Sequence, residues 1–182
     1  MGLTDRDIND AMDRYAVGDD SAFSVIYDGL SPRLYAFLRR GTNDDALARD
    51  LVQQTFLQIH GARERYATGL DVIPWAFAIA RRLRIDAFRK SGRKVLGEPV
   101  EHIASRGPSP HEELEHRRAA SALQHALESL PDAPREIYEL VEGYGLTMAQ
   151  AAEVLGTTVM AVKLRLHRAR QSLQTAARHL LE

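Results

Sequence analysis

Apolar residues recur at three- and four-residue intervals along almost the whole chain, and no stretch shows the sustained alternation typical of a β-strand. One such stripe consists of Phe23, Ile26, Tyr27, Leu30, Leu34, Phe37 and Leu38. A chain with this spacing buries helix faces against one another, and its many Ala, Leu, Arg, Glu and Gln residues also favour helices. The sequence therefore predicts an all-α fold.

Capping residues, glycines and prolines mark where the helices begin and end. The segment Asp19–Ser21 can cap the first stripe, Pro32 bends or breaks it, and residues 41–44 end it and start a second helix that fades at Gly61. A loop through Gly69 then leads into a third helix over residues 75–90, with Pro74 suited to its first turn. Further helices are expected over residues 111–129, 135–142, 148–155 and 159–177.

Residues 91–110 lack this periodicity and are rich in glycine and proline, a composition typical of a linker. We therefore expect two small helical domains joined by a flexible linker. The domains would cover residues 1–92 and 113–182, and the linker residues 93–112.

The composition narrows the functional classes. The 182 residues include no cysteine, which removes disulfides and thiolate metal sites. The polar N-terminus does not resemble a secretory signal, and no apolar run approaches the roughly 20 residues of a membrane helix. We expect a cytoplasmic protein without a cofactor, a metal site or membrane insertion.

The formal net charge is only −1, but the charges are unevenly distributed. Residues 81–94 hold seven basic residues and one acidic residue, and residues 163–178 hold five basic residues and no acidic one. Two basic segments in an otherwise acidic chain indicate two sites that contact phosphates, or simply two solvated helix faces.

Residues 147–166 have the spacing of a helix-turn-helix motif. Ala151 and Ala152 are small enough for a close helix crossing, and Gly156 suits a left-handed turn. The second helix can be capped by Thr157 or Thr158, and it then presents basic residues suited to the DNA major groove. An ordinary helical hairpin with a basic face is the alternative.

The helix over residues 75–90 combines an apolar line with a dense set of arginines. Such a helix can hold a single DNA strand, with cations on the backbone and aromatic rings against splayed bases. Aromatic residues on a helix belong to a hydrophobic core more often, so a core role remains open for Trp75, Phe77 and Phe88.

Both halves of the chain resemble the extracytoplasmic-function (ECF) sigma factors of bacterial RNA polymerase. Residues 45–57 resemble the region-two helix that docks on the clamp coiled coil of polymerase, and residues 75–89 resemble the helix that melts and reads the minus-ten element. Residues 127–170, with Leu130-Pro131, Arg135-Glu136 and Arg165–Arg170, resemble region four, which reads the minus-thirty-five element. The resemblance covers roughly residues 21–90 and 120–175.

This resemblance implies three sets of binding residues. The residues expected to bind core polymerase are Asp50, Gln53, Gln54 and Phe56. Those expected at the minus-ten strand are Trp75, Arg81, Arg82, Arg84 and Arg89, with the loop over residues 61–73 holding a flipped base. Those expected at the minus-thirty-five duplex are Thr158, Lys163, Arg165, His167 and Arg168.

The resemblance also implies partners: RNA polymerase core, promoter DNA and an anti-sigma factor. Three departures from the family pattern bear on the promoter sequence. Arg82 stands where asparagine is usual, Leu164 where a small polar residue is common, and Gln150-Ala151 where Glu-Ile is usual.

Three other classes of protein are alternatives to a sigma factor. A helix-turn-helix regulator that acts without polymerase explains residues 147–175 but leaves residues 45–57 and the basic helix unexplained. An enzyme is not favoured, because His111 and His116 lack zinc-protease spacing and no phosphate-binding loop is present. A purely structural interaction protein predicts weak DNA binding with little salt dependence.

Overall fold

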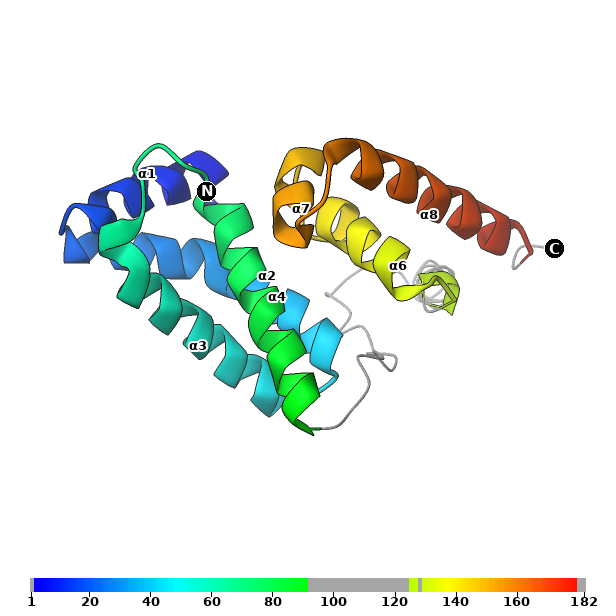
Figure 1. The fold of residues 1–182 in the computed structure, drawn as a ribbon, viewed down its shortest axis with the longest axis horizontal. Helices are drawn as coiled ribbons and strands as arrows, with labels where there is room; N and C mark the ends of the chain where they lie inside the picture. The colour runs from blue at the N-terminus through cyan, green and yellow to red at the C-terminus, as the bar shows by residue number, and fades with distance from the viewer. Residues whose placement is uncertain (1, 92–124, 128, 180–182) are drawn as a thin grey trace, which may run out of the picture.

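A computed structural model of the chain describes residues 2–91, 125–127 and 129–179. Every regular element in these ranges is helical, which confirms the predicted all-α class. The first group consists of α1 (Asp5–Ala16), η1 (Asp20–Ala22), α2 (Phe23–Thr42), α3 (Asp45–Ala62), η2 (Arg63–Arg65) and α4 (Val72–Ser91). The second consists of α6 (Asp132–Tyr138), η3 (Glu139–Gly143), α7 (Met148–Leu155) and α8 (Val159–His179). Figure 1 shows the two groups side by side, with α7 packed against α4.

Helix α1 was not predicted from the sequence. Its N-terminus is a capping box, in which Thr4 and Asp7 each bond the other's backbone N–H. The helix buries Ile8, Met12 and Tyr15 against the rest of the N-terminal group. The alternation of charged and apolar residues in this short segment is therefore that of an amphipathic helix.

Helix α2 continues through Pro32 and is not broken there. It ends at Asn43, whose backbone adopts the left-handed conformation at φ 52° and whose N–H bonds the carbonyl of Arg39. Asp44 then caps α3 by accepting a hydrogen bond from the Leu47 N–H at 3.0 Å. The predicted stop and restart over residues 41–44 is confirmed.

Helix α4 begins three residues before the predicted start. The Asp71 carboxylate accepts a hydrogen bond from the Ile73 N–H at 3.0 Å, and the Asn9 side chain accepts one from the Val72 N–H at 2.9 Å. These side chains satisfy donors that the first turn leaves without a helical partner. Pro74 lies in that first turn, as expected.

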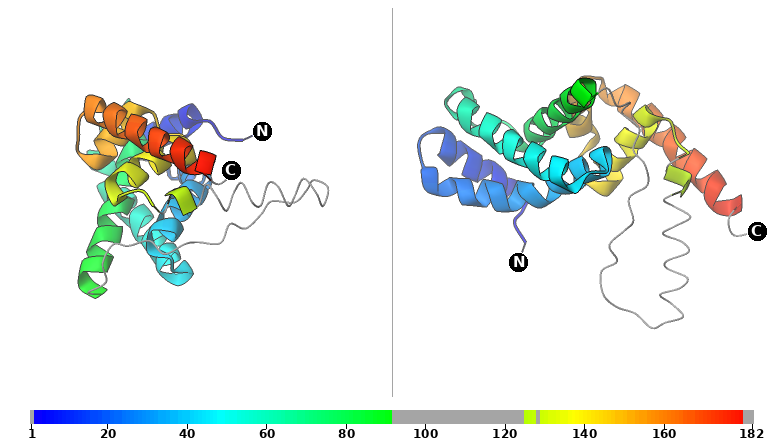
Figure 2. Two further views of the ribbon diagram at one scale, coloured as in Figure 1. Left: turned by 90° about the vertical axis from the view of Figure 1, so that its right-hand side faces the viewer. Right: turned by 90° about the horizontal axis from the view of Figure 1, so that it is seen from below.

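The helix-turn-helix motif is present. Helix α7 spans the predicted residues, and its N-terminus is a capping box between Thr147 and Gln150. Gly156 has a φ of 61°, and Thr158 accepts a hydrogen bond from the Ala161 N–H at 3.2 Å. Val162 is fully buried where α8 packs on α7. Figure 2 shows α8 extending from this crossing away from the N-terminal helices.

A single apolar core connects the two helix groups. It includes Phe37 and Phe77 from the first group and Leu140, Ala151 and Val162 from the second. A smaller cluster lies within the second group alone, formed by Ala126, Leu127, Leu130, Ala169 and Leu173. The second group is thus packed directly on the first.

The predicted linker over residues 93–112 and most of the predicted helix over residues 111–129 lie outside the described residues, although residues 125–127 are helical. Across the described ranges, no helix combines the length and the apolar character needed to cross a bilayer.

Candidate functional site

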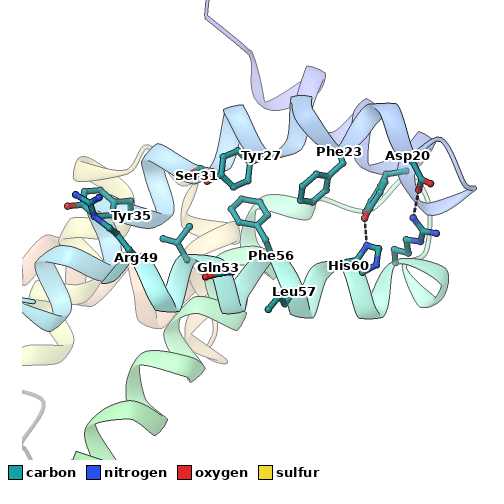
Figure 3. Close-up of a pocket in the computed structure, with 13 residues that line it drawn as sticks. Asp20, Phe23, Tyr27, Ser31, Tyr35, Arg49, Gln53, Phe56, Leu57 and His60 are labelled. Carbon is teal, nitrogen blue, oxygen red and sulfur yellow. Dashed lines mark hydrogen bonds and ion pairs between the residues drawn. The ribbon is translucent and has the colours of Figure 1, made fainter. Parts of the chain in front are cut away.

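The residues expected to bind polymerase lie on α3 and beside a groove. Asp50, Gln53 and Gln54 are exposed, whereas Phe56 is 5% exposed. Gln53 and Phe56 line a groove of about 1080 Å³ that runs between α2 and α3 (Figure 3). The other lining residues are Tyr15, Asp20, Phe23, Tyr27, Ser31, Tyr35, Arg49, Val52, Leu57, His60 and Arg63.

Aromatic rings form the middle of this groove. The Phe56 ring lies with its centroid 4.7 Å from that of Tyr27 and 6.0 Å from that of Phe23, the latter pair edge to face. Tyr27 is 44% exposed and Leu57 is 62% exposed, so apolar surface is open to solvent along the groove. Leu57 was not predicted as a site residue, although its position outside the buried stripe of α3 indicates that it faces outward.

Polar groups close both ends of the groove. At one end, Tyr15 hydrogen-bonds His60, and Arg63 pairs with Asp20 (Figure 3). At the other end, the Tyr35 hydroxyl donates to Asp45. This bond lowers the pKa of Asp45 and raises that of Tyr35. An apolar trough with charged ends has the chemistry that binds one face of an amphipathic helix.

The cations of α4 are not equally accessible. Arg82 and Arg89 are exposed, and Arg82 donates a hydrogen bond to Gln58 at 2.7 Å. Arg81 is half-buried, and Arg84 is only 7% exposed. Of the arginines predicted to bind the single DNA strand, Arg82 and Arg89 are therefore accessible to solvent, whereas Arg81 and Arg84 are covered.

The aromatic residues of α4 also differ. Phe77 and Phe88 are buried, which supports the core alternative for these two rings. Trp75 is half-buried, with its ring centroid 5.4 Å from that of Tyr66 in the loop before α4. Burial raises the pKa of Tyr66 to about 12, and its hydroxyl donates to the Leu70 carbonyl. Of the predicted loop over residues 61–73, only residues 66–71 connect η2 to α4, and the Tyr66 bond closes this connection beside Trp75.

Glu136 on α6 covers the two less accessible arginines. Its carboxylate accepts two hydrogen bonds from Arg81, at 2.9 Å from Nε and 3.1 Å from Nη2. It accepts a third from Arg84 Nη2 at 2.7 Å. The Arg84 guanidinium also lies over the Phe37 ring, 4.6 Å from its centroid. One carboxylate therefore pairs with two cations of the predicted minus-ten helix.

Further contacts surround Glu136, Arg81 and Arg84. Glu139 pairs with Arg40 of α2 at 2.9 Å, and burial raises the pKa of Glu139 despite nearby arginines. The Tyr144 hydroxyl donates to the Ala36 carbonyl at 3.2 Å, and Arg33 donates to the Tyr144 carbonyl at 3.0 Å. Glu139 and Tyr144 were not predicted as site residues.

The predicted minus-thirty-five residues lie around the exposed surface of α8 and at its start, with Lys163 and His167 about one turn apart on one side and Arg165 and Arg168 on the other. Lys163, Arg165, His167 and Arg168 are all exposed. Thr158 is exposed as well and caps the start of the helix. The structure therefore places four of the five on the first half of α8 and Thr158 directly before it.

Apolar side chains adjoin this basic face. Met160 is 72% exposed and Leu164 is 49% exposed. Both line a cavity of about 330 Å³ together with Met148, Lys163, Leu166, His167 and Arg170. A face that combines cations with apolar contacts can bond base edges and pack on thymine methyl groups.

Comparisons with known proteins match both helix groups. The family model for sigma-70 region 2 matches residues 26–94, and the model for sigma-70 region 4 matches residues 120–173. The ECF RNA polymerase sigma factor SigF of Caulobacter vibrioides is 34% identical over 162 residues, which cover 86% of each chain.

Two solved structures share the arrangement of helices. CnrH in complex with the cytosolic domain of CnrY has a TM-score of 0.68 and 25% identity, covering 93% of this chain and 96% of CnrH. The sigma factor RpoE in complex with the anti-sigma factor NepR from Bartonella quintana also has a TM-score of 0.68, with 24% identity and coverage of 86% and 96%.

Proposed function

This chain belongs to the ECF sigma factors of the sigma-70 family, and we propose that its two helix groups divide polymerase docking and promoter recognition between them. A sigma factor binds core RNA polymerase and directs promoter-specific initiation. Its part in transcription is recognition, and RNA synthesis is carried out by the polymerase. A helix-turn-helix regulator without polymerase is not favoured, because region 2 is matched as well as region 4.

We assign duplex recognition at the minus-thirty-five element to the first half of α8. The observation that carries this assignment is that the helix after the turn at Gly156 exposes its cations to solvent, namely Lys163, Arg165, His167 and Arg168. Arginine bonds the edge of guanine with two donors, and the remaining cations fix the register on phosphates. Thr158, at the start of the same helix, lies where helix-turn-helix proteins approach the DNA backbone.

We assign the minus-ten strand to α4 and the loop before it. Arg82 and Arg89 are open to solvent and suit the strand's phosphates. Trp75 beside Tyr66 offers aromatic surface next to the loop that would take a flipped base. Arg81 and Arg84 belong to the same set, but they become available only when Glu136 leaves them.

We assign polymerase docking to the outer face of α3 and the groove beside it. Asp50, Gln53 and Gln54 supply polar contacts, and Phe56 with Leu57 supplies apolar surface. A coiled coil presents amphipathic helices, which match an apolar trough with charged ends.

We also propose an anti-sigma partner and a cytoplasmic location. The support is the fold shared with CnrH, solved with the cytosolic domain of CnrY, and with RpoE, solved with the anti-sigma factor NepR. A sigma factor also has to meet polymerase where DNA is transcribed.

Association with core polymerase tests the central assignment. The labelled protein should bind purified bacterial core polymerase and be displaced by a second sigma factor, because both occupy the same surface. Absence of association, together with salt-sensitive binding to duplex DNA, would instead favour the regulator that acts without polymerase.

A further inference from the structure

In the free protein, two arginines of α4 are covered by one carboxylate of the second helix group. Arg81 and Arg84 donate to the same carboxylate, that of Glu136, which lies 55 and 52 residues further along the chain. Resting on the function proposed above, we propose that the free protein inhibits itself: Glu136 takes the place of a DNA phosphate on Arg81 and Arg84.

The chemistry of the contact supports the proposal that Glu136 occupies the place of a DNA phosphate. A carboxylate and a phosphate both present two oxygens to the planar guanidinium group, and both accept paired hydrogen bonds from it. Arg81 forms such a pair with Glu136, at 2.9 and 3.1 Å. Arg84 is 7% exposed, so a strand cannot reach its guanidinium without displacing α6. Glu136 therefore competes directly with DNA for these two cations.

Tyr144 adds contacts that hold the second helix group against the first. We call this closed arrangement, with Glu136 on Arg81 and Arg84, the lock. Its ring lies against Phe37 and Phe77, with centroid distances of 5.7 and 5.9 Å, and its hydroxyl and carbonyl bond α2. Removing the second helix group from α4 would expose these rings as well as the two arginines. Opening thus exposes buried apolar surface and also breaks the ion pairs. It therefore requires a partner that binds the open form more tightly than the closed form.

The sequence allows the lock to be measured directly. The chain contains no cysteine, so spin labels can be attached at Asp28→Cys on α2 and Gln171→Cys on α8, both exposed positions. The distance between the labels reports whether the two helix groups stay together. Glu136→Arg should widen this distance, because it places a third cation against Arg81 and Arg84.

A matched control separates opening from added charge. Glu153 is exposed on α7, and Glu153→Arg makes the same change of charge in the same helix group. A fluorescein-labelled single DNA strand of mixed sequence serves as the probe. Glu136→Arg should bind this strand at least about 5-fold more tightly than Glu153→Arg, at the low end of typical coupling between sites. Adding Arg81→Gln to Glu136→Arg should reduce that gain.

The outcomes are distinct. Equal label distances in Glu136→Arg and Glu153→Arg would overturn the lock, provided that circular dichroism shows both variants folded. A wider label distance in Glu136→Arg, with the same affinity for the DNA strand as in Glu153→Arg, would overturn the proposal that Glu136 occupies the place of a phosphate. The proposed function is judged separately, because failure of the wild-type protein to associate with core polymerase leaves the label distances unaffected.

Discussion

Gly41 on α2 makes room for the side chain of Arg84 on α4. A Cβ at position 41 would lie 2.6 Å from Arg84 Cδ and within 2.9 Å of its guanidinium carbon. These separations are below van der Waals contact, and the Arg84 side chain is confined between Phe37 and Glu136. The absence of a side chain at one position of α2 therefore allows the contact that covers the predicted minus-ten helix.

Gly41→Ala should move Arg84 and weaken the closed state. The free energy of unfolding should fall by about 1–3 kcal/mol, as for other overpacked sites, even though alanine favours helix. Chemical denaturation measures this change, and the label distance reports opening. Gly61→Ala on α3 is the control, because nothing lies within 4 Å of its added Cβ. Equal stability of both variants would contradict the account of Gly41.

Gly156→Ala tests the turn of the helix-turn-helix motif. Nothing lies within 4 Å of the added Cβ, so only the left-handed backbone at φ 61° is strained. The free energy of unfolding should fall by about 1–2 kcal/mol. Gly143→Ala also has open space but no positive φ, and it should lack this penalty. A smaller loss for Gly156→Ala than for Gly143→Ala would refute the argument.

The groove on α3 should govern affinity for core polymerase. Leu57→Asp places a charge on its apolar surface, and affinity should fall by about 10-fold or more if Leu57 is a principal contact. Leu57 is 62% exposed, so the free protein should remain folded. Val17→Asp is the matched control, because Val17 is 78% exposed and does not line the groove. Similar losses in both variants would argue against docking in the groove.

The exposed cations of α8 should determine the salt dependence of duplex binding. Removing a phosphate contact with Arg168→Ala should reduce the slope of log affinity against log salt by about 0.9. If Arg165 bonds a base edge instead, Arg165→Ala should cost about 1–3 kcal/mol and relax specificity at one base pair. Fluorescence anisotropy at several salt concentrations distinguishes the two. Unchanged slopes and affinities would remove α8 from the DNA interface.

The packing of the second helix group on the first, or closure, should depend on pH through Glu139. Burial raises its pKa above the ordinary 4.5, so the closed state holds a proton that an open, solvated Glu139 releases. Protonation of Glu139 therefore favours closure as the pH falls toward its raised pKa, and this contribution is lost as the pH rises through that value. The charged groups around it are Arg40 on α2, Arg84 on α4, and Arg135 and Glu136 on α6.

The label distance followed against pH measures this effect. The other charged groups around Glu139 are the same in the wild type and in the control. Glu139→Gln is that control, since it cannot ionise. The difference between the two pH profiles isolates Glu139, and identical profiles would contradict its role.

Local patterns in the sequence predicted the helix-turn-helix motif of the second group, whereas α6 begins at Asp132 rather than at residue 135 and gives way to η3 at Glu139. The bounds of α7 and the turn at Gly156 follow from residues within one short segment, since Thr147 caps the helix and glycine tolerates the left-handed turn. The predicted start of α4 is too late, because Pro74 alone places the first turn in the prediction; Asp71 is a local signal for the earlier start, whereas the second capping side chain, Asn9, comes from 63 residues away. Capping by a distant residue leaves no mark in the local spacing.

The site could be predicted only in part for the same reason. The exposed cations of α8 follow from helical spacing beside a known turn. The cover over Arg81 and Arg84 depends on where α6 lies relative to α4, and the resemblance of Arg135-Glu136 to region four does not indicate that Glu136 pairs with these arginines. The capping box at Thr4 and Asp7 was visible in the sequence, and it marked the helix α1 that was not predicted.

Run-off transcription tests the assignment as a sigma factor most directly. Purified core polymerase is supplied with a pool of upstream DNA from the source genome, with and without the protein. We expect specific transcripts that appear only when the protein is present and that disappear when Arg165 and Arg168 are both changed to glutamate. Absence of any protein-dependent transcript, with duplex binding intact, would contradict the account.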